Sequence, residues 1–127
     1  MGAFVSLADD LRFEPRFVDK PWGSELIWAL SEVYCGKILT VDPGESLSLQ
    51  YHELKDESWY VLEGVATLEL GTSDTELETS EIRVGNAFRY TPGTRHRVTA
   101  IETLRILEVS TPHLDDVVRV EDRYGRA

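Results

Sequence analysis

The sequence is poor in cysteine and has no long apolar run. Its 127 residues include one cysteine, Cys35, so no disulfide can form within the chain and nothing points to an oxidising compartment. No apolar stretch approaches the roughly 18 residues that a membrane-spanning helix needs. No basic region followed by an apolar core marks a secretory signal. We therefore expect a cytoplasmic protein with no membrane association.

Positive charge is also scarce. Thirteen Lys and Arg stand against 23 Asp and Glu, which gives a formal net charge of −10. This charge argues against binding to nucleic acid or to an anionic membrane surface, because both are themselves negative. A phosphorylated small molecule would have to meet a local group of cations. The length leaves room for one domain with a single core.

What the chain contains from Phe17 onward is a series of short strand-like segments separated by turn residues such as Asp42-Pro43-Gly44 and Pro92-Gly93. Residues 65–70 and 104–109 alternate so that one face is apolar. Short strands spaced by about 8–12 residues favour a sandwich or barrel over βαβ units. We predict an all-β domain over residues 17–127. The predicted strands are 16–19, 25–30, 34–41, 46–52, 58–62, 65–70, 81–84, 87–91, 97–101 and 104–109.

Two terminal segments flank this barrel. Residues 1–16 are predicted to be an N-terminal extension, in which Phe4, Leu7, Ala8 and Leu11 share one face of a short helix. We expect that helix to pack across an open barrel edge or against a partner subunit. Because open barrels expose edge strands that need covering, we expect a homodimer. The charged segment 115–126 carries enough valine and tyrosine to predict that part of it docks.

Polar residues of a metal-ligand type lie at suggestive spacings. Gln50 and His52 are two residues apart, so in a strand both side chains leave by the same face. Glu57 follows, and His96 comes later on a strand that would be a neighbour in a barrel. Two imidazoles, a carboxylate and an amide oxygen suit a divalent ion such as Zn, Mn, Fe, Co or Ni. The alternative is a metal-free pocket in which these groups hydrogen-bond a ligand.

The same residues fall into a recognisable pattern. Gly44, five residues, Gln50-x-His52, four residues, Glu57, six residues, Gly64 resembles the first motif of the cupin family, with Gln50 where His is usual. Gly85 followed by PGTRH at 92–96 resembles the second motif, although Pro and Gly are adjacent and Ala100 replaces the customary Asn. The resemblance implies a double-stranded β-helix, or jelly-roll barrel, with a metal held by Gln50, His52, Glu57 and His96.

A narrower resemblance covers residues 17–126. KPWG, SLSLQYH, ESW, HRV and DDVVRVEDRYGR appear in that order, as in the type II mannose-6-phosphate isomerase domain, a cupin that often follows a sugar-nucleotide pyrophosphorylase. The resemblance implies a small-molecule substrate, a sugar phosphate, and metal-dependent interconversion of mannose-6-phosphate and fructose-6-phosphate or a related aldose and ketose. The alternatives are a cupin dioxygenase, an epimerase without a metal role, or a sugar-binding cupin without turnover.

The resemblance also implies which cations meet the substrate. Basic residues at matching positions predict substrate binding by Lys37, Lys55, Arg97 and Arg126, and catalytic roles for Lys37 and Arg119. Arginine suits a phosphate because its guanidinium donates two hydrogen bonds in parallel. Each of these cations could instead pair with one of the many nearby acids. Lys55 stands where the resembling family has arginine, which is not a conservative change at a bidentate site.

Overall fold

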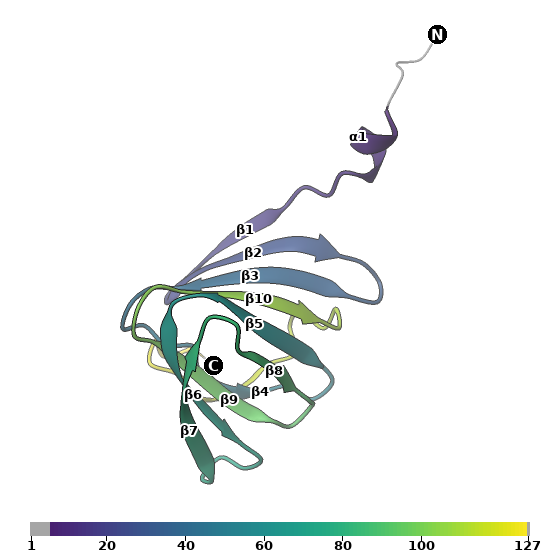
Figure 1. Cartoon of the computed structure of the whole chain (residues 1–127). Coiled ribbons are helices and arrows are strands. Elements are labelled where there is room, and N and C mark those ends of the chain that lie inside the picture. Colours follow the sequence, from purple (N-terminus) through teal and green to yellow (C-terminus); the bar gives the residue numbers. More distant parts are fainter. Residues whose placement is uncertain (1–5, 127) are drawn as a thin grey trace.

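A computed structural model describes residues 6–126 and consists mainly of β-strands (Figure 1). Its single helix in the described region, Leu7–Leu11, begins after Ser6, whose side chain accepts a hydrogen bond from the backbone N–H of Asp9. The strands confirm the predicted all-β barrel. The elements are α1 (Leu7–Leu11), β1 (Arg16–Lys20), β2 (Gly23–Leu30), β3 (Cys35–Val41), β4 (Leu49–Tyr51), β5 (Glu57–Glu63), β6 (Val65–Gly71), β7 (Leu77–Arg83), β8 (Ala87–Tyr90), β9 (Arg95–Ala100), β10 (Leu104–Ser110) and β11 (Val118–Glu121).

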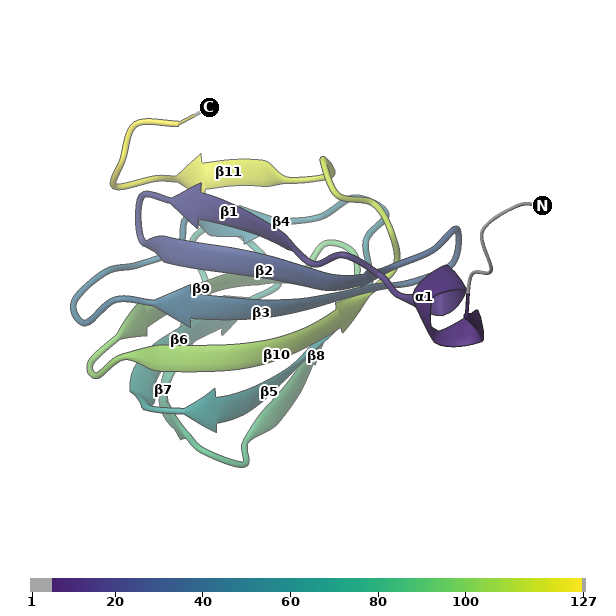
Figure 2. The ribbon, with the colours of Figure 1, turned by 90° about the horizontal axis from the view of Figure 1, so that it is seen from above.

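The strands form two antiparallel sheets that face each other (Figures 1 and 2). One sheet has six strands in the order β1-β2-β3-β10-β5-β8, and the other has five in the order β11-β4-β9-β6-β7. Consecutive strands often lie in different sheets, which is the jelly-roll topology that the sequence predicts. β4 and β9 are neighbours, so the first-motif strand does lie beside the strand that carries His96.

The core lies between the sheets because each strand alternates between inward apolar and outward residues. Ala66 and Leu68 on β6, and Leu104 and Ile106 on β10, are fully buried. Trp59 joins them from β5. The next inward position on β10 is Glu108, which is also buried. A charged residue therefore continues an otherwise apolar row, and this places a polar site at one end of the core.

The structure differs from the sequence prediction at the ends of some strands and in the terminal segments. β4 covers only Leu49–Tyr51 of the predicted 46–52, and β7 begins at Leu77 rather than residue 81. The segment after β10 does dock, because Val118–Glu121 pairs with β4. Helix α1 buries no residue and stands away from the barrel in Figure 1, so it does not pack across the barrel edge. Phe4 lies outside the described residues.

One glycine shows how tightly the strands connect. Gly64 alone joins β5 to β6 with φ +93°, and a Cβ there would lie 2.1 Å from the carbonyl oxygen of Thr103. Only glycine fits this left-handed, closely packed link. Within the described residues, no helix is long and apolar enough to cross a membrane.

Candidate metal centre

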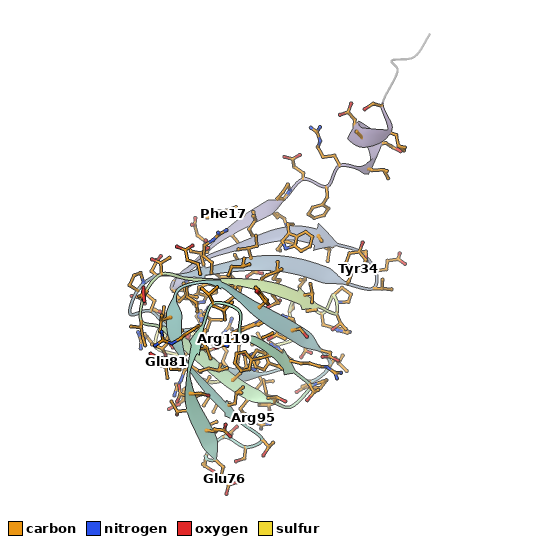
Figure 3. All side chains as sticks on the ribbon, viewed as in Figure 1. Phe17, Tyr34, Glu76, Glu81, Arg95 and Arg119 are labelled. Carbon is orange, nitrogen blue, oxygen red and sulfur yellow. The ribbon has the colours of Figure 1, made fainter. Side chains whose placement is uncertain are left out.

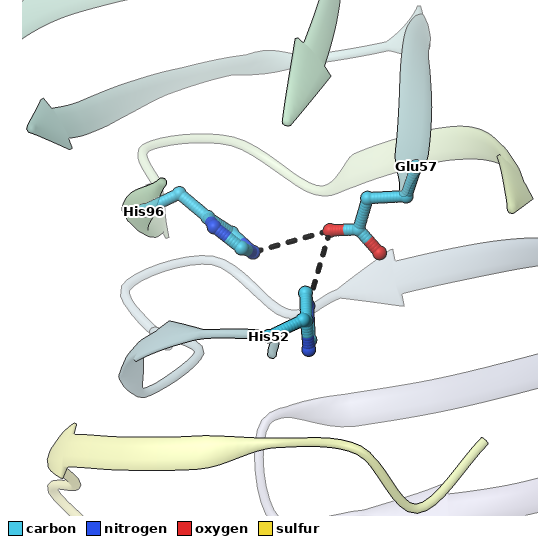
Figure 4. A group of neighbouring side chains, drawn as sticks. All are labelled: His52, Glu57 and His96. Atoms are coloured by element: carbon cyan, nitrogen blue, oxygen red, sulfur yellow. Dashed lines mark ion pairs between the residues drawn. The ribbon is translucent and has the colours of Figure 1, made fainter. Parts of the chain in front are cut away.

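Three of the predicted ligands converge at one end of the core (Figure 4). His52 follows β4, Glu57 begins β5 and His96 lies on β9, and all three are buried. Glu57 Oε1 lies 3.5 Å from His52 Nε2 and 3.1 Å from His96 Nε2. Ligand atoms of the three residues lie within 4.8 Å of one another. Two imidazoles and one carboxylate form the mixed N/O set that borderline divalent metals prefer.

The ring of His52 is oriented by the C-terminal segment. Its Nδ1 is hydrogen-bonded to the carbonyl oxygen of Asp116. The carboxylate of Asp116 also accepts backbone N–H groups of Glu53, Leu54 and Lys55, and thereby holds the loop between His52 and Glu57. These N–H donors lower the pKa of Asp116, against the opposing effect of its burial. One residue thus fixes both the histidine and its loop.

The ring of His96 is oriented by its own strand and by aromatic neighbours. Its Nδ1 lies 3.0 Å from the carbonyl oxygen of Thr94. Tyr90 stacks on the imidazole with ring centroids 4.3 Å apart and an interplanar angle of 5°. Trp59 meets the same ring edge-on at 5.8 Å. The imidazole is therefore confined on several sides.

These hydrogen bonds decide which nitrogen is available. A carbonyl oxygen can only accept, so Nδ1 of His52 and of His96 must each carry a proton. In the neutral rings both Nε2 atoms then present lone pairs, and each faces Glu57 Oε1, which also only accepts. Neither Nε2 has a hydrogen-bond partner, and both are buried. Three converging acceptors require a cation between them, either a proton or a metal ion, so these residues fit a divalent metal.

Glu57 supplies the negative charge of the three-residue site. Burial alone would raise the pKa of its carboxyl, but the adjacent His52 and His96 and the charge of Lys55 lower it well below the ordinary value. Its second oxygen, Oε2, lies 2.9 Å from Lys55 Nζ. The carboxylate is therefore ionised, with one oxygen directed at the histidines and the other at a cation.

Gln50 shares the inward face with these residues. It lies opposite His96 in the β4–β9 register and lines the same cavity as His52 and Glu57. Its amide as a fourth metal ligand stays a prediction.

His52 and Glu57 line a cavity of about 100 Å³ between the two sheets, and His96 lies behind them, outside its lining. Five basic and four acidic side chains line it, so its local charge balance is opposite in sign to that of the whole chain. A bound divalent ion would make it more positive still. The basic residues are Lys20, Lys37, Lys55, Arg119 and Arg126, and the acidic residues are Glu25, Glu57, Glu108 and Asp116.

Most of these cations already contact a carboxylate. Lys37 Nζ lies 2.5 Å from Glu25 Oε1, and Lys20 Nζ lies 3.5 Å from Glu25 Oε2. Burial would raise the pKa of the Glu25 carboxyl, but the charges of Lys37 and Lys20 lower it below the ordinary value. Arg119 lies opposite Gln50 in the β11–β4 register and lines the cavity. The predicted catalytic pair, Lys37 and Arg119, therefore reaches one cavity from opposite sheets.

Arg97 corrects the prediction that it binds the same ligand. It follows His96 in β9, so its side chain leaves by the opposite face of the sheet. There it is 2.6 Å from Glu69 and 3.2 Å from Glu121, and it is not among the residues that line the cavity. Neighbouring side chains in a strand point to opposite faces of the sheet. An inward His96 therefore predicts an outward Arg97 from the sequence alone.

Lys55 lines the cavity between two carboxylates. It is buried, with Nζ 2.9 Å from Glu57 Oε2 and 3.2 Å from Glu108 Oε2. Glu108 in turn accepts a hydrogen bond from Trp59 Nε1 at 3.1 Å. Burial would lower the pKa of Lys55, but the two carboxylates raise it well above the ordinary value. Its ammonium contacts both carboxylates and also lines the cavity, so substrate binding by Lys55 stays a prediction.

Arg126, which lines the cavity, is held by Asp122 through two side-chain hydrogen bonds of 2.9 Å. Chiefly through these bonds, the pKa of Asp122 falls to about 2 from the ordinary 3.8. A carboxylate with a lowered folded-state pKa stabilises the fold above pH 3.8 and loses that contribution as the pH falls toward 2.

We therefore expect the urea midpoint of the wild type to exceed that of Asp122→Asn equally at pH 7 and pH 5, and by less at pH 3. Denaturation followed by circular dichroism measures the difference. A difference that stays constant to pH 3 would contradict the assigned ion pair.

The fold and the convergent His/Glu site define a cupin. The chain belongs to the mannose-6-phosphate isomerase C-terminal family, whose pattern matches residues 9–122. Two relatives are the xanthan biosynthesis protein XanB of Xanthomonas campestris pv. campestris (strain B100) and the mannose-1-phosphate guanylyltransferase ManC of Salmonella typhimurium. XanB is 35% identical over 117 residues, and ManC is 34% identical over 119.

In both cases the alignment covers 87% of this chain, but only 24% of XanB and 23% of ManC, so the chain spans about a quarter of these relatives. Among solved structures, the oxalate decarboxylase of Bacillus subtilis, a protein with Mn(II) centres, superposes with a TM-score of 0.69. It is 23% identical and covers 85% of this chain, which spans 30% of it. This likeness concerns the fold.

Proposed function

We propose that the chain is a metal-dependent cupin that interconverts mannose-6-phosphate and fructose-6-phosphate, or a related aldose and ketose. One observation carries the proposal: His52 Nε2, His96 Nε2 and Glu57 Oε1 converge without a proton donor among them, at the base of a cavity lined by basic residues. Family membership and relatives that act in sugar metabolism support the substrate class.

His52, Glu57 and His96 would hold the ion, with Gln50 as the candidate fourth ligand. A divalent metal bound there supplies Lewis-acid polarisation of a substrate carbonyl. The ligands come from both sheets, Glu57 from the six-stranded one and His52 and His96 from the five-stranded one, so the sugar would lie beside them in the rest of the cavity. The chain's own residues then orient the substrate and exclude water.

Lys37 and Arg119 are the residues that we assign to the reacting part of the substrate. They approach the cavity from β3 and β11 in opposite sheets, so a sugar between them would be held from two sides. Arg126 lines the cavity beside Asp122, where its guanidinium would suit the phosphate of an open-chain sugar. Glu25, 2.5 Å from Lys37, would hold that ammonium in place.

A second candidate is a sugar-binding cupin without turnover. It is favoured by the pairing of Lys37, Lys55 and Arg126 with carboxylates, which leaves less positive charge for a phosphate dianion. The net charge of −10 acts in the same direction at long range.

A coupled assay with purified protein separates the two candidates. We expect fructose-6-phosphate to be converted to mannose-6-phosphate by metal-loaded protein, with activity lost on chelation and restored by added metal. Lys37→Met should lower kcat/KM by roughly 100-fold or more, because positioning of a reacting group is worth several kcal/mol. Arg83→Met, an exposed cation paired with Glu81 outside the cavity, is the matched control. Binding without turnover for every divalent metal would establish the second candidate instead.

A further inference from the structure

The KPWG segment at residues 20–23 has no part in the chemistry proposed above, although Lys20 and Trp22 both line the cavity. It forms the short turn between β1 and β2, in which Lys20 pairs with Gly23. Phe17, labelled in Figure 3, marks the strand that leads into this turn. The turn therefore brings a cation to the cavity from the edge of the six-stranded sheet.

The other residues of the turn hold its backbone in place. Trp22 is buried, and its carbonyl oxygen accepts a hydrogen bond of 2.9 Å from the backbone N–H of Asp42. Gly23 has φ +149°, and a Cβ there would lie 2.0 Å from the carbonyl oxygen of Thr40, so only glycine permits this approach to β3. The position of Lys20 is thereby fixed at its backbone, while its side chain extends to the cavity.

Lys20 has the longest carboxylate contact among the three lysines of the cavity. Its Nζ lies 3.5 Å from Glu25 Oε2, whereas Lys37 Nζ lies 2.5 Å from Oε1 of the same carboxylate, and Lys55 has contacts of 2.9 and 3.2 Å. The Lys20 side chain is also 29% exposed, against 8% and 7% for the other two. A partly exposed ion pair contributes little, so this ammonium can turn to an incoming anion at small cost.

A second cation reaches the same end of the cavity from the C-terminal segment. Arg126 lines the cavity, and the nearby Arg123 donates a hydrogen bond of 2.6 Å to the carbonyl oxygen of Gly44. Gly44 belongs to the loop after β3, which also holds Trp22 through Asp42. Figure 2 shows this end of the barrel, where β1 and β11 both end. The KPWG turn and the C-terminal segment thus border one end of the cavity together.

The metal ligands lie away from the KPWG turn. Lys20 ends β1, whereas Glu57 begins β5, four strands further along the sheet order β1-β2-β3-β10-β5. Lys37, on β3, lies between them in this order. An open-chain sugar phosphate has a matching layout, because its carbonyl and its phosphate are at opposite ends of the carbon chain. A ligand whose phosphate meets Lys20 would therefore direct its carbonyl towards His52 and Glu57.

We propose that Lys20, together with Arg126, binds the phosphate of the substrate and so determines which end of the sugar meets the metal ligands. The inference rests on the proposed function for the class of ligand, a sugar phosphate, and adds a residue that determines specificity within it. Lys20 supplies a compact charge, and Arg126 supplies a planar guanidinium with parallel donors. Glu25 keeps Lys37 when Lys20 turns to the phosphate, so no buried carboxylate is left without a cation.

Binding of mannose-6-phosphate to chelator-treated protein, measured by isothermal titration calorimetry, tests this subsite without turnover. We expect Lys20→Met to raise the dissociation constant roughly tenfold or more, because a charge-assisted hydrogen bond is lost. Lys20→Arg keeps the charge and should bind nearly as the wild type does. Arg105→Met is the matched control, because it removes one positive charge from an outward position on β10, outside the cavity lining.

Mannose without a phosphate separates recognition of the anion from a general change in the cavity. It should bind more weakly than mannose-6-phosphate to the wild type, and equally to the wild type and Lys20→Met. In metal-loaded protein, Lys20→Met should raise KM for mannose-6-phosphate with a smaller change in kcat, since the phosphate is bound equally in the ground and transition states.

The outcomes distinguish this subsite from the proposed reaction. Equal affinity of Lys20→Met and Arg105→Met for mannose-6-phosphate would overturn the subsite, whether or not the wild type is active. A loss of mannose binding as large as the loss of mannose-6-phosphate binding would overturn it too. If the wild type shows no turnover but Lys20→Met still weakens binding of mannose-6-phosphate alone, the isomerase reaction fails and the phosphate subsite stands.

Discussion

Replacing Glu57 by Gln is expected to lower divalent-metal affinity by roughly 100- to 1,000-fold. Four-ligand zinc sites bind with about 10–16 kcal/mol, so one ligand contributes about 3 kcal/mol. The substitution removes the anionic oxygen that lies between the two histidines and leaves the side-chain shape unchanged. Competition with a chromophoric chelator measures the affinity, and metal analysis after dialysis gives the stoichiometry.

Loss of fold would not explain that result. In the metal-free wild type, Lys55 is shared by Glu57 and Glu108, so removing one carboxylate leaves a balanced pair. The Glu57→Gln protein should therefore unfold in chelator at a urea concentration no lower than that of the wild type. His113→Ala, at an exposed histidine hydrogen-bonded to Thr111, is the control for metal binding. Equal affinity in Glu57→Gln and wild type would exclude this site as the metal centre.

Lys55→Met is expected to destabilise the metal-free protein by about 3–5 kcal/mol, which is typical when one partner of a buried ion pair is removed. Glu57 and Glu108 would then remain buried without the ammonium that contacts both of them. The pKa of Glu108 supports the same expectation. Burial and the charge of Glu57 raise this pKa, and the charge of Lys55 acts against them, so Lys55 favours the ionised carboxylate. Urea denaturation in the presence of chelator measures the loss.

Two further variants distinguish this pairing from simple packing. Lys55→Arg keeps the charge and should recover most of the stability. Lys55→Met combined with Glu108→Gln should be more stable than Lys55→Met alone, since both members of one pair are then neutral. If Lys55→Met unfolds at the wild-type urea concentration, the ammonium is not what stabilises the two carboxylates.

The barrel could be predicted because local alternation and turn chemistry agree with the tertiary fold. Residues 65–70 and 104–109 show the period of two, and both are strands with an apolar inner face. The start of β7 was not predicted because Leu77–Ser80 lies at a sheet edge with little burial, so its sequence carries no alternation. β11 was not predicted as a strand because its pairing with β4 depends on a distant segment.

The site was predicted in part for similar reasons. His52, Glu57 and His96 occupy the positions of the two cupin motifs described above, and the structure brings them together. Glu108 was missed although a signal existed, because it falls in phase with Leu104 and Ile106 on the inward face. Asp116 carries no local signal, since its contacts with His52 and the loop at 53–55 span more than sixty residues.

The position of Asp116 in the chain has a consequence for how the protein matures. Synthesis runs from the N-terminus, so β1 to β10 emerge before Asp116 does. Until then His52 lacks the carbonyl that fixes its tautomer, and its loop lacks the carboxylate that gathers three N–H groups. A nascent barrel would therefore expose an unfinished binding site until Asp116 has emerged and docked.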